Sequence, residues 1–171
     1  MTYKTVQLGA PHRREDFSCG KEPLDSYFKR QVRQDIKRKL SACFVLEGSD
    51  HAVKGYYTLS NDSVPLAIVP EEIRKKMPAF YTNLPTTLLG RLAVDTRFRR
   101  QRLGELLLMD ALHRCYDLSE QIGSMAVIVD PLDGEAAAFY KQYGFIALES
   151  GRMFLPMKTV AALFKFVSNI I

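Results

Sequence analysis

Four arginines gather in a short segment near the centre of the chain, between two apolar stretches. They are Arg97, Arg99, Arg100 and Arg102, and we call residues 97–102 the arginine segment. The stretch before it, 88–94, is typical of a buried strand, and the stretch after it, 105–113, is typical of a helix. The first turn of a helix has backbone N–H groups without intrahelical acceptors and carries the positive end of the helix dipole. The pattern therefore predicts a binding site for a phosphate or pyrophosphate.

A second group of basic residues lies further towards the N-terminus. Between positions 29 and 39, which we call the basic segment, six lysines and arginines stand against the single acidic residue Asp35. On a continuous helix, Lys29, Arg33 and Lys37 share one face because they are spaced by four residues. Such a face is either solvated surface or a contact for the phosphates of a nucleic acid, and the sequence leaves both interpretations open.

The composition is that of a globular protein with a modest excess of positive charge. Of the 171 residues, 47% are hydrophobic and 25% are charged, and the formal net charge is +5. This length predicts one domain over residues 1–171, and the charge favours polyanionic partners. No apolar run approaches the roughly 18 residues of a membrane span, and the N-terminus lacks the layout of a secretory signal. The three cysteines lack metal-type spacing, which favours reduced thiols in a cytoplasmic protein that makes no membrane contact.

Hydrophobic periodicity and turn residues predict a chain in which strands and helices alternate. Strands are expected at 3–8, 41–47, 53–62, 64–68, 88–94, 124–129 and 151–156, and helices at 24–40, 70–76, 103–121, 133–142 and 160–168. The spacing of the strands 41–47 and 53–62 predicts a hairpin, and the later part of the chain alternates strand and helix. This order predicts an α/β (α+β) fold with a mixed sheet and helices on both faces.

Two motifs in the second half of the chain resemble those of the GNAT N-acetyltransferases. The acetyl-CoA loop of that family reads R/Q-x-x-G-x-G/A, and Arg99 and Gly104 match its two ends. The last family motif commonly runs F-Y-x-x-x-G-F, and residues 139–145 match it in order and spacing. Arg102 stands where the first glycine of the loop usually lies, so its side chain must keep clear of the phosphates or fold over them. The resemblance implies the GNAT fold, a mixed and mostly antiparallel sheet with splayed central parallel strands.

The resemblance also implies acetyl-CoA as the cosubstrate, without a metal. In this family the cofactor lies where two parallel strands splay apart, here 88–94 and 125–129. The N–H group of Ala93 or Val94 would polarise the thioester carbonyl, and a free amine would attack it directly. The residues implied to bind acetyl-CoA are Leu92, Ala93, Val94, Arg99, Arg100, Gln101, Arg102, Leu103, Gly104, Glu105 and Phe139.

Tyr140 matches the tyrosine that serves as general acid in many members of this family. A phenol with an ordinary pKa of about 10 is protonated at neutral pH and can give its proton to the leaving thiolate. The alternative is an aromatic residue that only packs beside Phe139. For the general base the candidates are Glu135, His113, Asp130 and Asp133. None has a distinctive partner in the sequence, and an α-amine with a pKa of about 8 needs only water, so we assign no protein base.

The first half of the chain is similar to one subgroup, the GNAT toxins of bacterial toxin–antitoxin pairs. Residues 16–27 match their opening segment F-x-C-G-x-x-x-L-D-x-Y/F, and residues 90–95 also look like that subgroup. Such toxins acetylate the α-amine of aminoacyl-tRNA, which blocks translation, and a ribbon–helix–helix antitoxin holds them inactive. The resemblance thus implies an aminoacyl-tRNA substrate and such an antitoxin as partner. The candidates for contacts with tRNA phosphates are Lys29, Arg33, Lys37 and Arg91, and for Arg91 a buried ion pair is the alternative.

Two other functions stay open at this point. One is a GNAT enzyme that acetylates a small-molecule amine or a protein N-terminus, although a polyamine is disfavoured because the only acidic cluster is Glu71-Glu72. The other is a fold that binds CoA or nucleic acid without turnover. The mostly apolar residues 160–171 would need a partner if exposed. A homodimer is the first expectation for them, with an antitoxin groove or a cap on the domain as alternatives.

Overall fold

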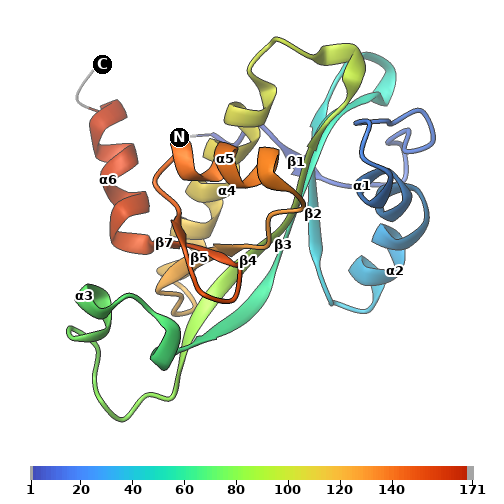
Figure 1. Cartoon of the computed structure of the whole chain (residues 1–171). Helices are drawn as coiled ribbons and strands as arrows, with labels where there is room; N and C mark the ends of the chain where they lie inside the picture. The colour runs from blue at the N-terminus through green and yellow to red at the C-terminus, as the bar shows by residue number, and fades with distance from the viewer. Residues whose placement is uncertain (1, 169–171) are drawn as a thin grey trace. The chain divides into compact units, whose positions relative to one another are not determined.

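The computed structural model describes the backbone of residues 2–168 and the side chains up to residue 165. In chain order its elements are β1 (Val6–Gln7), α1 (Glu22–Ser26), α2 (Val32–Lys37), β2 (Ala42–Glu47), β3 (Val53–Pro65), α3 (Glu71–Arg74), β4 (Asn83–Val94), α4 (Leu103–Ser119), β5 (Ala126–Val129), α5 (Gly134–Gln142), β6 (Ile146–Ala147), β7 (Met153–Pro156) and α6 (Met157–Ser168) (Figure 1). The strands form one seven-stranded sheet in the order β1-β2-β3-β4-β5-β7-β6. The predicted α/β fold with a mixed sheet is confirmed. No helix in the described part of the chain is long and apolar enough to cross a membrane.

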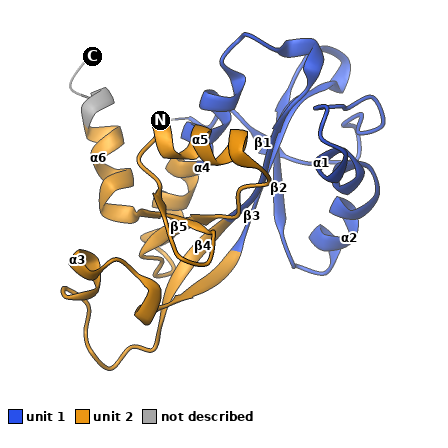
Figure 2. Ribbon diagram, viewed as in Figure 1, with its two compact units in different colours: residues 1–60, 89–111 blue, residues 61–88, 112–171 orange. Residues whose placement is uncertain are grey.

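The chain divides into two compact units (Figure 2). Unit 1 consists of residues 1–60 and 89–111, and unit 2 consists of residues 61–88 and 112–171. The elements β3, β4 and α4 each begin in one unit and end in the other. We therefore describe each unit by itself, and the single domain expected from the length of the chain stays a prediction.

In unit 1, helices cover both faces of β3, as the sequence predicts. Tyr56 stacks on Phe28 with ring centroids 4.3 Å apart, and its hydroxyl donates a hydrogen bond to the carbonyl of Leu24 in α1 (2.8 Å). The next residue, Tyr57, donates instead to the carboxylate of Asp110 in α4 (2.8 Å). Neighbouring residues of a strand point to opposite faces, so α1 and α4 lie on opposite sides of this strand. The hairpin of β2 and β3 is antiparallel, as expected.

In unit 2, the core forms around β5 and β7. Ile128 lies opposite Phe154 in an antiparallel register, and both are fully buried. The helix α6 packs against these two strands, and Phe164 on it contacts the ring of His113 at 5.2 Å. The apolar face of α6 is thus partly covered within its own unit. Of the three roles considered for residues 160–171, which were a dimer contact, an antitoxin groove and a cap on the domain, this contact favours the cap. Residues 169–171 of the expected dimer contact lie outside the described residues.

The prediction of one continuous helix over residues 24–40 is wrong. Between α1 and α2 the chain forms a π-helical turn, Tyr27–Gln31, in which the N–H of Val32 donates to the carbonyl of Tyr27. The wider turn accommodates two consecutive aromatic residues, Tyr27 and Phe28, that are both buried. The helix then ends at Lys37, and Lys39 adopts a left-handed φ of 60°.

Other boundaries differ where local signals are weak. β4 begins at Asn83, five residues before the predicted start, and the expected strand 64–68 is mostly a short 3-10 turn, Leu66–Ile68. β1 shrinks to Val6–Gln7, and α3 to Glu71–Arg74. The strand Ile146–Ala147 was not predicted, because two exposed residues carry no periodic pattern.

Candidate functional site

The arginine segment follows β4 through a buried aspartate. Asp95 is 1% exposed and begins the 3-10 turn Thr96–Phe98. Its carboxylate accepts hydrogen bonds from the backbone N–H of Arg97 (2.8 Å), from the guanidinium Nε of Arg97 (2.9 Å) and from the N–H of Ser18 (3.1 Å). Burial alone would raise the pKa of Asp95, but these hydrogen bonds hold it below the ordinary value. A charged Asp95 therefore fixes the point where the strand turns into the segment.

Two arginines in the segment adopt a backbone conformation that favours glycine. Arg100 has a φ of 63° and Arg102 a φ of 56°. Left-handed conformations cost an ordinary residue about 1 kcal/mol, whereas glycine adopts them freely. Arg102, which stands at a glycine position of the GNAT motif, thus has a backbone conformation that glycine adopts without a steric cost. Its side chain, 82% exposed, forms an ion pair with Glu105 (2.5 Å).

The helix α4 begins directly after this turn. The N–H of Leu106 donates to the carbonyl of Arg102 (3.1 Å), which is the first bond of the helical ladder. The N–H groups of Leu103, Gly104 and Glu105 precede it and have no intrahelical acceptors. The side chains of Arg99, Arg100 and Gln101 beside them are exposed. This end of α4 can therefore offer backbone donors and guanidinium groups to one anion, as the sequence predicts.

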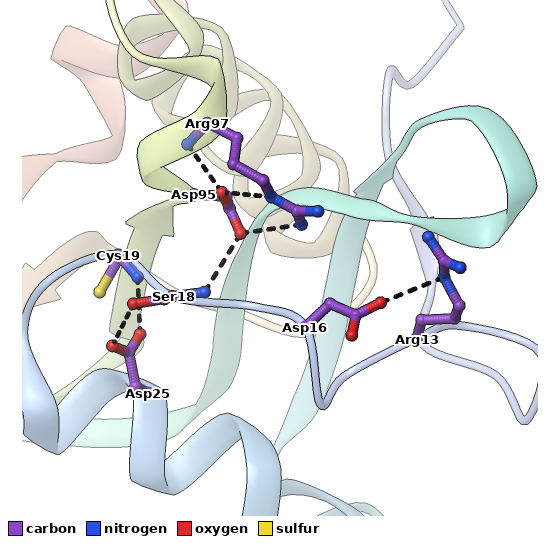
Figure 3. A network of polar contacts seen from close by, with 7 residues as sticks. All are labelled: Arg13, Asp16, Ser18, Cys19, Asp25, Asp95 and Arg97. Carbon is purple, nitrogen blue, oxygen red and sulfur yellow. Dashed lines mark hydrogen bonds and ion pairs between the residues drawn. The ribbon is translucent and has the colours of Figure 1, made fainter.

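A second segment, around Ser18 and Cys19, holds the start of the arginine segment in place (Figure 3). The N–H of Thr96 donates to the carbonyl of Ser18 (2.9 Å), while the N–H of Ser18 donates to Asp95. Asp25 of α1, 7% exposed, accepts in turn from the N–H of Cys19 (2.8 Å) and from the hydroxyl of Ser18 (3.2 Å). Residues 16–27 thus carry a structural role that the sequence motif signalled only as a resemblance.

Gly20 completes this contact. It has a φ of 85°, and a Cβ atom there would lie 3.2 Å from the guanidinium Nη2 of Arg99. A side chain at this position would be strained and would press on Arg99.

Burial raises the pKa of the neighbouring Cys19 thiol to about 11, so Cys19 is a protonated, unreactive thiol at neutral pH.

Tyr140 lies on α5 in unit 2 with its ring among other aromatic residues. It is 7% exposed and forms edge contacts with Phe139 and Phe145, each with ring centroids 5.3 Å apart. Asp133 caps the helix by accepting from the N–H of Ala136 (2.9 Å). Burial raises the pKa of Tyr140, and within the described residues its hydroxyl has no hydrogen-bond partner. The ring of Tyr140 thus packs against its aromatic neighbours, and its hydroxyl is available for a proton transfer.

All four candidate general bases, Glu135 included, have contacts within the protein. Asp130 accepts a hydrogen bond from the Nε of Arg152 (2.8 Å), and Asp133 caps α5. His113 lies against Phe164, with Asp117 at 3.6 Å. These contacts give no support to a protein base. Among the described residues, no group of three or more histidine, cysteine or acidic side chains could hold a metal ion.

The three basic-segment candidates for tRNA contacts are exposed, and Arg91 is half-buried against an aromatic ring. Lys29, Arg33 and Lys37 all reach solvent, although the π-helical turn breaks the regular spacing that would align them. The guanidinium of Arg91 stacks on the ring of Tyr27 at 3.4 Å, and Tyr27 donates to Asp35 (2.9 Å). No ion pair joins Arg91 to a carboxylate among the described residues, so the structure gives no support to the alternative of a buried ion pair.

The predicted cofactor residues fall into both units. Leu92 to Glu105 belong to unit 1, in which β4, the arginine segment and the start of α4 are consecutive. Phe139 and Tyr140 belong to unit 2. The residues that sequence reasoning did not assign to the site are Ser18, Asp25 and Asp95. The sequence marked these three residues only through the family motifs that contain them. A carboxylate that holds a backbone turn occurs at no fixed sequence spacing, so no pattern predicts it.

Comparison with known proteins gives matches over most of the chain. The family model described as an acetyltransferase (GNAT) domain matches residues 20–159. A protein named tRNA-acetylating toxin, from Mycobacterium tuberculosis, is 38% identical over 129 residues, which are 75% of each chain. The solved structure of AtaT complexed with acetyl-methionyl-tRNAfMet has a TM-score of 0.85 at 29% identity and covers 95% of this chain and 98% of its own.

A second structure of AtaT contains other ligands. It is a tyrosine-to-phenylalanine variant bound to acetyl-CoA and to the C-terminus of the antitoxin AtaR. Its TM-score is 0.79 at 26% identity, and the match covers 94% of this chain and 96% of the other. The seven-stranded sheet and its helices are thus those of solved acetyltransferase toxins.

Proposed function

This chain belongs to the GNAT acetyltransferase family, and we propose that it is a toxin that acetylates the α-amine of aminoacyl-tRNA and thereby blocks translation. The relative that is 38% identical is named for tRNA acetylation, and AtaT was solved with an acetylated aminoacyl-tRNA. The observation that carries the proposal is the turn at residues 99–104, where Arg102 has a glycine-like backbone and α4 presents unpaired donors. That arrangement suits the pyrophosphate of acetyl-CoA.

For acetyl-CoA, we assign the pyrophosphate to the backbone and side chains of residues 99–105. The pantetheine arm is assigned to the end of β4, at residues 92–94, with Phe139 as an apolar contact. The N–H of Ala93 or Val94 would stabilise the negative charge that develops on the thioester oxygen. These assignments rest on the family motif together with the backbone geometry of the arginine segment.

In the reaction, the amine nitrogen of the substrate attacks the thioester carbonyl, and the new C–N bond replaces the C–S bond. The ammonium formed in that step gives its proton to water, since no side chain is assigned as base. Tyr140 gives its phenolic proton to the departing thiolate of CoA and regains one from solvent. The phenol of Tyr140 is protonated at neutral pH, because its ordinary pKa is about 10 and burial raises that pKa further.

The proposed partners follow from the same relatives. We assign the phosphates of tRNA to Lys29, Arg33 and Lys37, which are exposed, and to Arg91, which is partly exposed beside Tyr27. AtaT binds the C-terminus of an antitoxin, which supports an antitoxin partner here; we propose that it is of the ribbon–helix–helix type. A homodimer and a cytoplasmic location complete the proposal.

The direct experiment is mass spectrometry of charged tRNAs after incubation with the purified protein and acetyl-CoA. We expect an N-acetyl-aminoacyl product on at least one tRNA, and its loss with the Tyr140→Phe variant. No such product over all tRNA species would remove the toxin function. Acetylation of a small amine or a protein N-terminus in the same assay would instead identify an ordinary member of the family.

A further inference from the structure

A cavity of about 350 Å³ opens beside the basic segment in unit 1. Residues 10–16 form most of its lining, and Arg33 of α2 forms the rest. None of the lining residues belongs to the arginine segment or to β4. The cavity is thus separate in sequence from the residues assigned to acetyl-CoA.

Two guanidinium groups at this cavity lack acidic partners. Arg14 is held by the π-helical turn Tyr27–Gln31, where it donates to the carbonyls of Phe28 (3.2 Å) and Lys29 (2.9 Å). Within the described residues, no ion pair joins Arg14 or Arg33 to a carboxylate. Arg14 and Arg33 line the same cavity, and the pKa of Arg14 is lowered first by burial and then by the charge of Arg33.

The acidic residues of the lining do not compensate these charges. Asp16 lies 3.4 Å from the Nε of Arg13 and is engaged by it (Figure 3). Glu15 is the other carboxylate at the cavity, and its charge acts on Arg14 less strongly than that of Arg33. Two like charges at one cavity favour an anion that can contact both.

The excess positive charge of the chain is concentrated here. Residues 10–16 and the basic segment together contain eight lysines and arginines against three acidic residues. This surplus of five equals the net charge of the whole chain, +5. This surplus favours a polyanion near the basic segment, as the four arginines of the arginine segment do near the start of α4.

We propose that the cavity holds one backbone phosphate of the tRNA substrate, bound by the guanidinium groups of Arg33 and Arg14. This inference rests on the proposed function and deepens it, because it replaces a diffuse basic surface with one defined phosphate contact. Arginine suits that contact, since its planar fork donates two hydrogen bonds to a phosphate. The position of Arg14, held by two carbonyls, makes the site pre-organised.

The experiment compares two exposed arginines of the same helical region, Arg33 at the cavity and Arg30 away from it. Arg33→Gln and its matched control Arg30→Gln are assayed for KM with aminoacyl-tRNA, for the dissociation constant of acetyl-CoA and for salt dependence. We expect Arg33→Gln to raise the KM for tRNA about tenfold, as the loss of a charged hydrogen bond does. The slope of log KM against log salt should fall by about one, and acetyl-CoA binding should not change. Arg30→Gln should alter the KM much less.

Two outcomes would overturn the inference, and each would do so in a distinct way. Equal effects of the two variants would show a diffuse basic surface, and weaker binding of acetyl-CoA with Arg33→Gln would assign the cavity to a phosphate of the cofactor. Inorganic phosphate that competes with tRNA only in the wild type would support the cavity as an anion site. If the wild type acetylates no aminoacyl-tRNA at all, the proposed function fails instead, and that result is read from the wild type alone.

Discussion

Tyr140 combines a packed ring with a hydroxyl that has no hydrogen-bond partner in the described part of the chain. The change Tyr140→Phe removes the hydroxyl and keeps the ring contacts with Phe139 and Phe145. We expect kcat to fall by about 10²–10⁴-fold, the usual contribution of a general acid, with the affinity for acetyl-CoA unchanged. Steady-state kinetics and calorimetry measure the two effects separately. An equal loss of affinity would show that the hydroxyl binds the cofactor and does not act as an acid.

Gly104 tests the phosphate site at the start of α4. An aspartate in its place adds bulk and a negative charge beside the proposed pyrophosphate, so Gly104→Asp should weaken acetyl-CoA binding by about tenfold or more. Gly123→Asp is the matched control, because Gly123 has open space around it. Titration calorimetry with acetyl-CoA reports both variants. An unchanged affinity in Gly104→Asp would place the phosphates elsewhere.

For single residues, the sequence predicts which positions belong to the site better than it predicts their backbone conformations and side-chain contacts. The motif predicted that Arg102 occupies a glycine position, but only the structure shows a left-handed backbone there, with the side chain paired to Glu105. Arg91 was predicted as an ion pair or a nucleic-acid contact, and it stacks on Tyr27. Stacking partners come from distant elements, and residue spacing carries no information about them.

At the scale of elements, Asp95 joins the end of β4, the arginine segment and the turn at Ser18. Its pKa is lowered in the folded state, so its charge adds stability above the unfolded value of about 3.9, and that stability is lost as the pH falls through the folded value. Asp95→Asn should cost about 2 kcal/mol of unfolding free energy at pH 7, and the difference from wild type should shrink below pH 4.

Denaturant unfolding at several pH values measures this effect. Asp50→Asn is the control, because Asp50 is exposed and its left-handed φ of 53° suits asparagine. The Asp95 variant should also bind acetyl-CoA more weakly, since the arginine segment loses its fixed start. A constant difference in stability from pH 3 to pH 7 would rule out the charge of Asp95 as the cause.

The elements that the sequence predicts well are those with strong periodicity and clear end signals. α4 starts at Leu103 as predicted, and α5 follows Asp133, whose side chain caps it. The π-helical turn at residues 27–31 could not be predicted, because it arises from packing two adjacent aromatic side chains into one core. The helix propensities of these residues do not distinguish a π turn from an α turn.

For the whole molecule, the length of the chain predicts one domain, whereas the structure shows two compact units that share β3, β4 and α4. The family model spans residues from both units, which favours folding as one body. Length alone cannot decide this, because cooperativity depends on how much apolar surface the shared elements bury. The three cysteines offer a way to measure it.

Cys43 lies in unit 1 and Cys115 in unit 2, and both are buried. Burial raises the pKa of each thiol to about 12, so neither forms the reactive thiolate in the folded protein at pH 8. If the chain unfolds as one domain, both thiols should become reactive to a maleimide at the same urea concentration. Peptide mass spectrometry after labelling resolves each site. The half-exposed Cys19 serves as an internal control, because its labelling before the main transition would report only local opening. Labelling of Cys43 and Cys115 at clearly different urea concentrations would instead show two units that unfold independently.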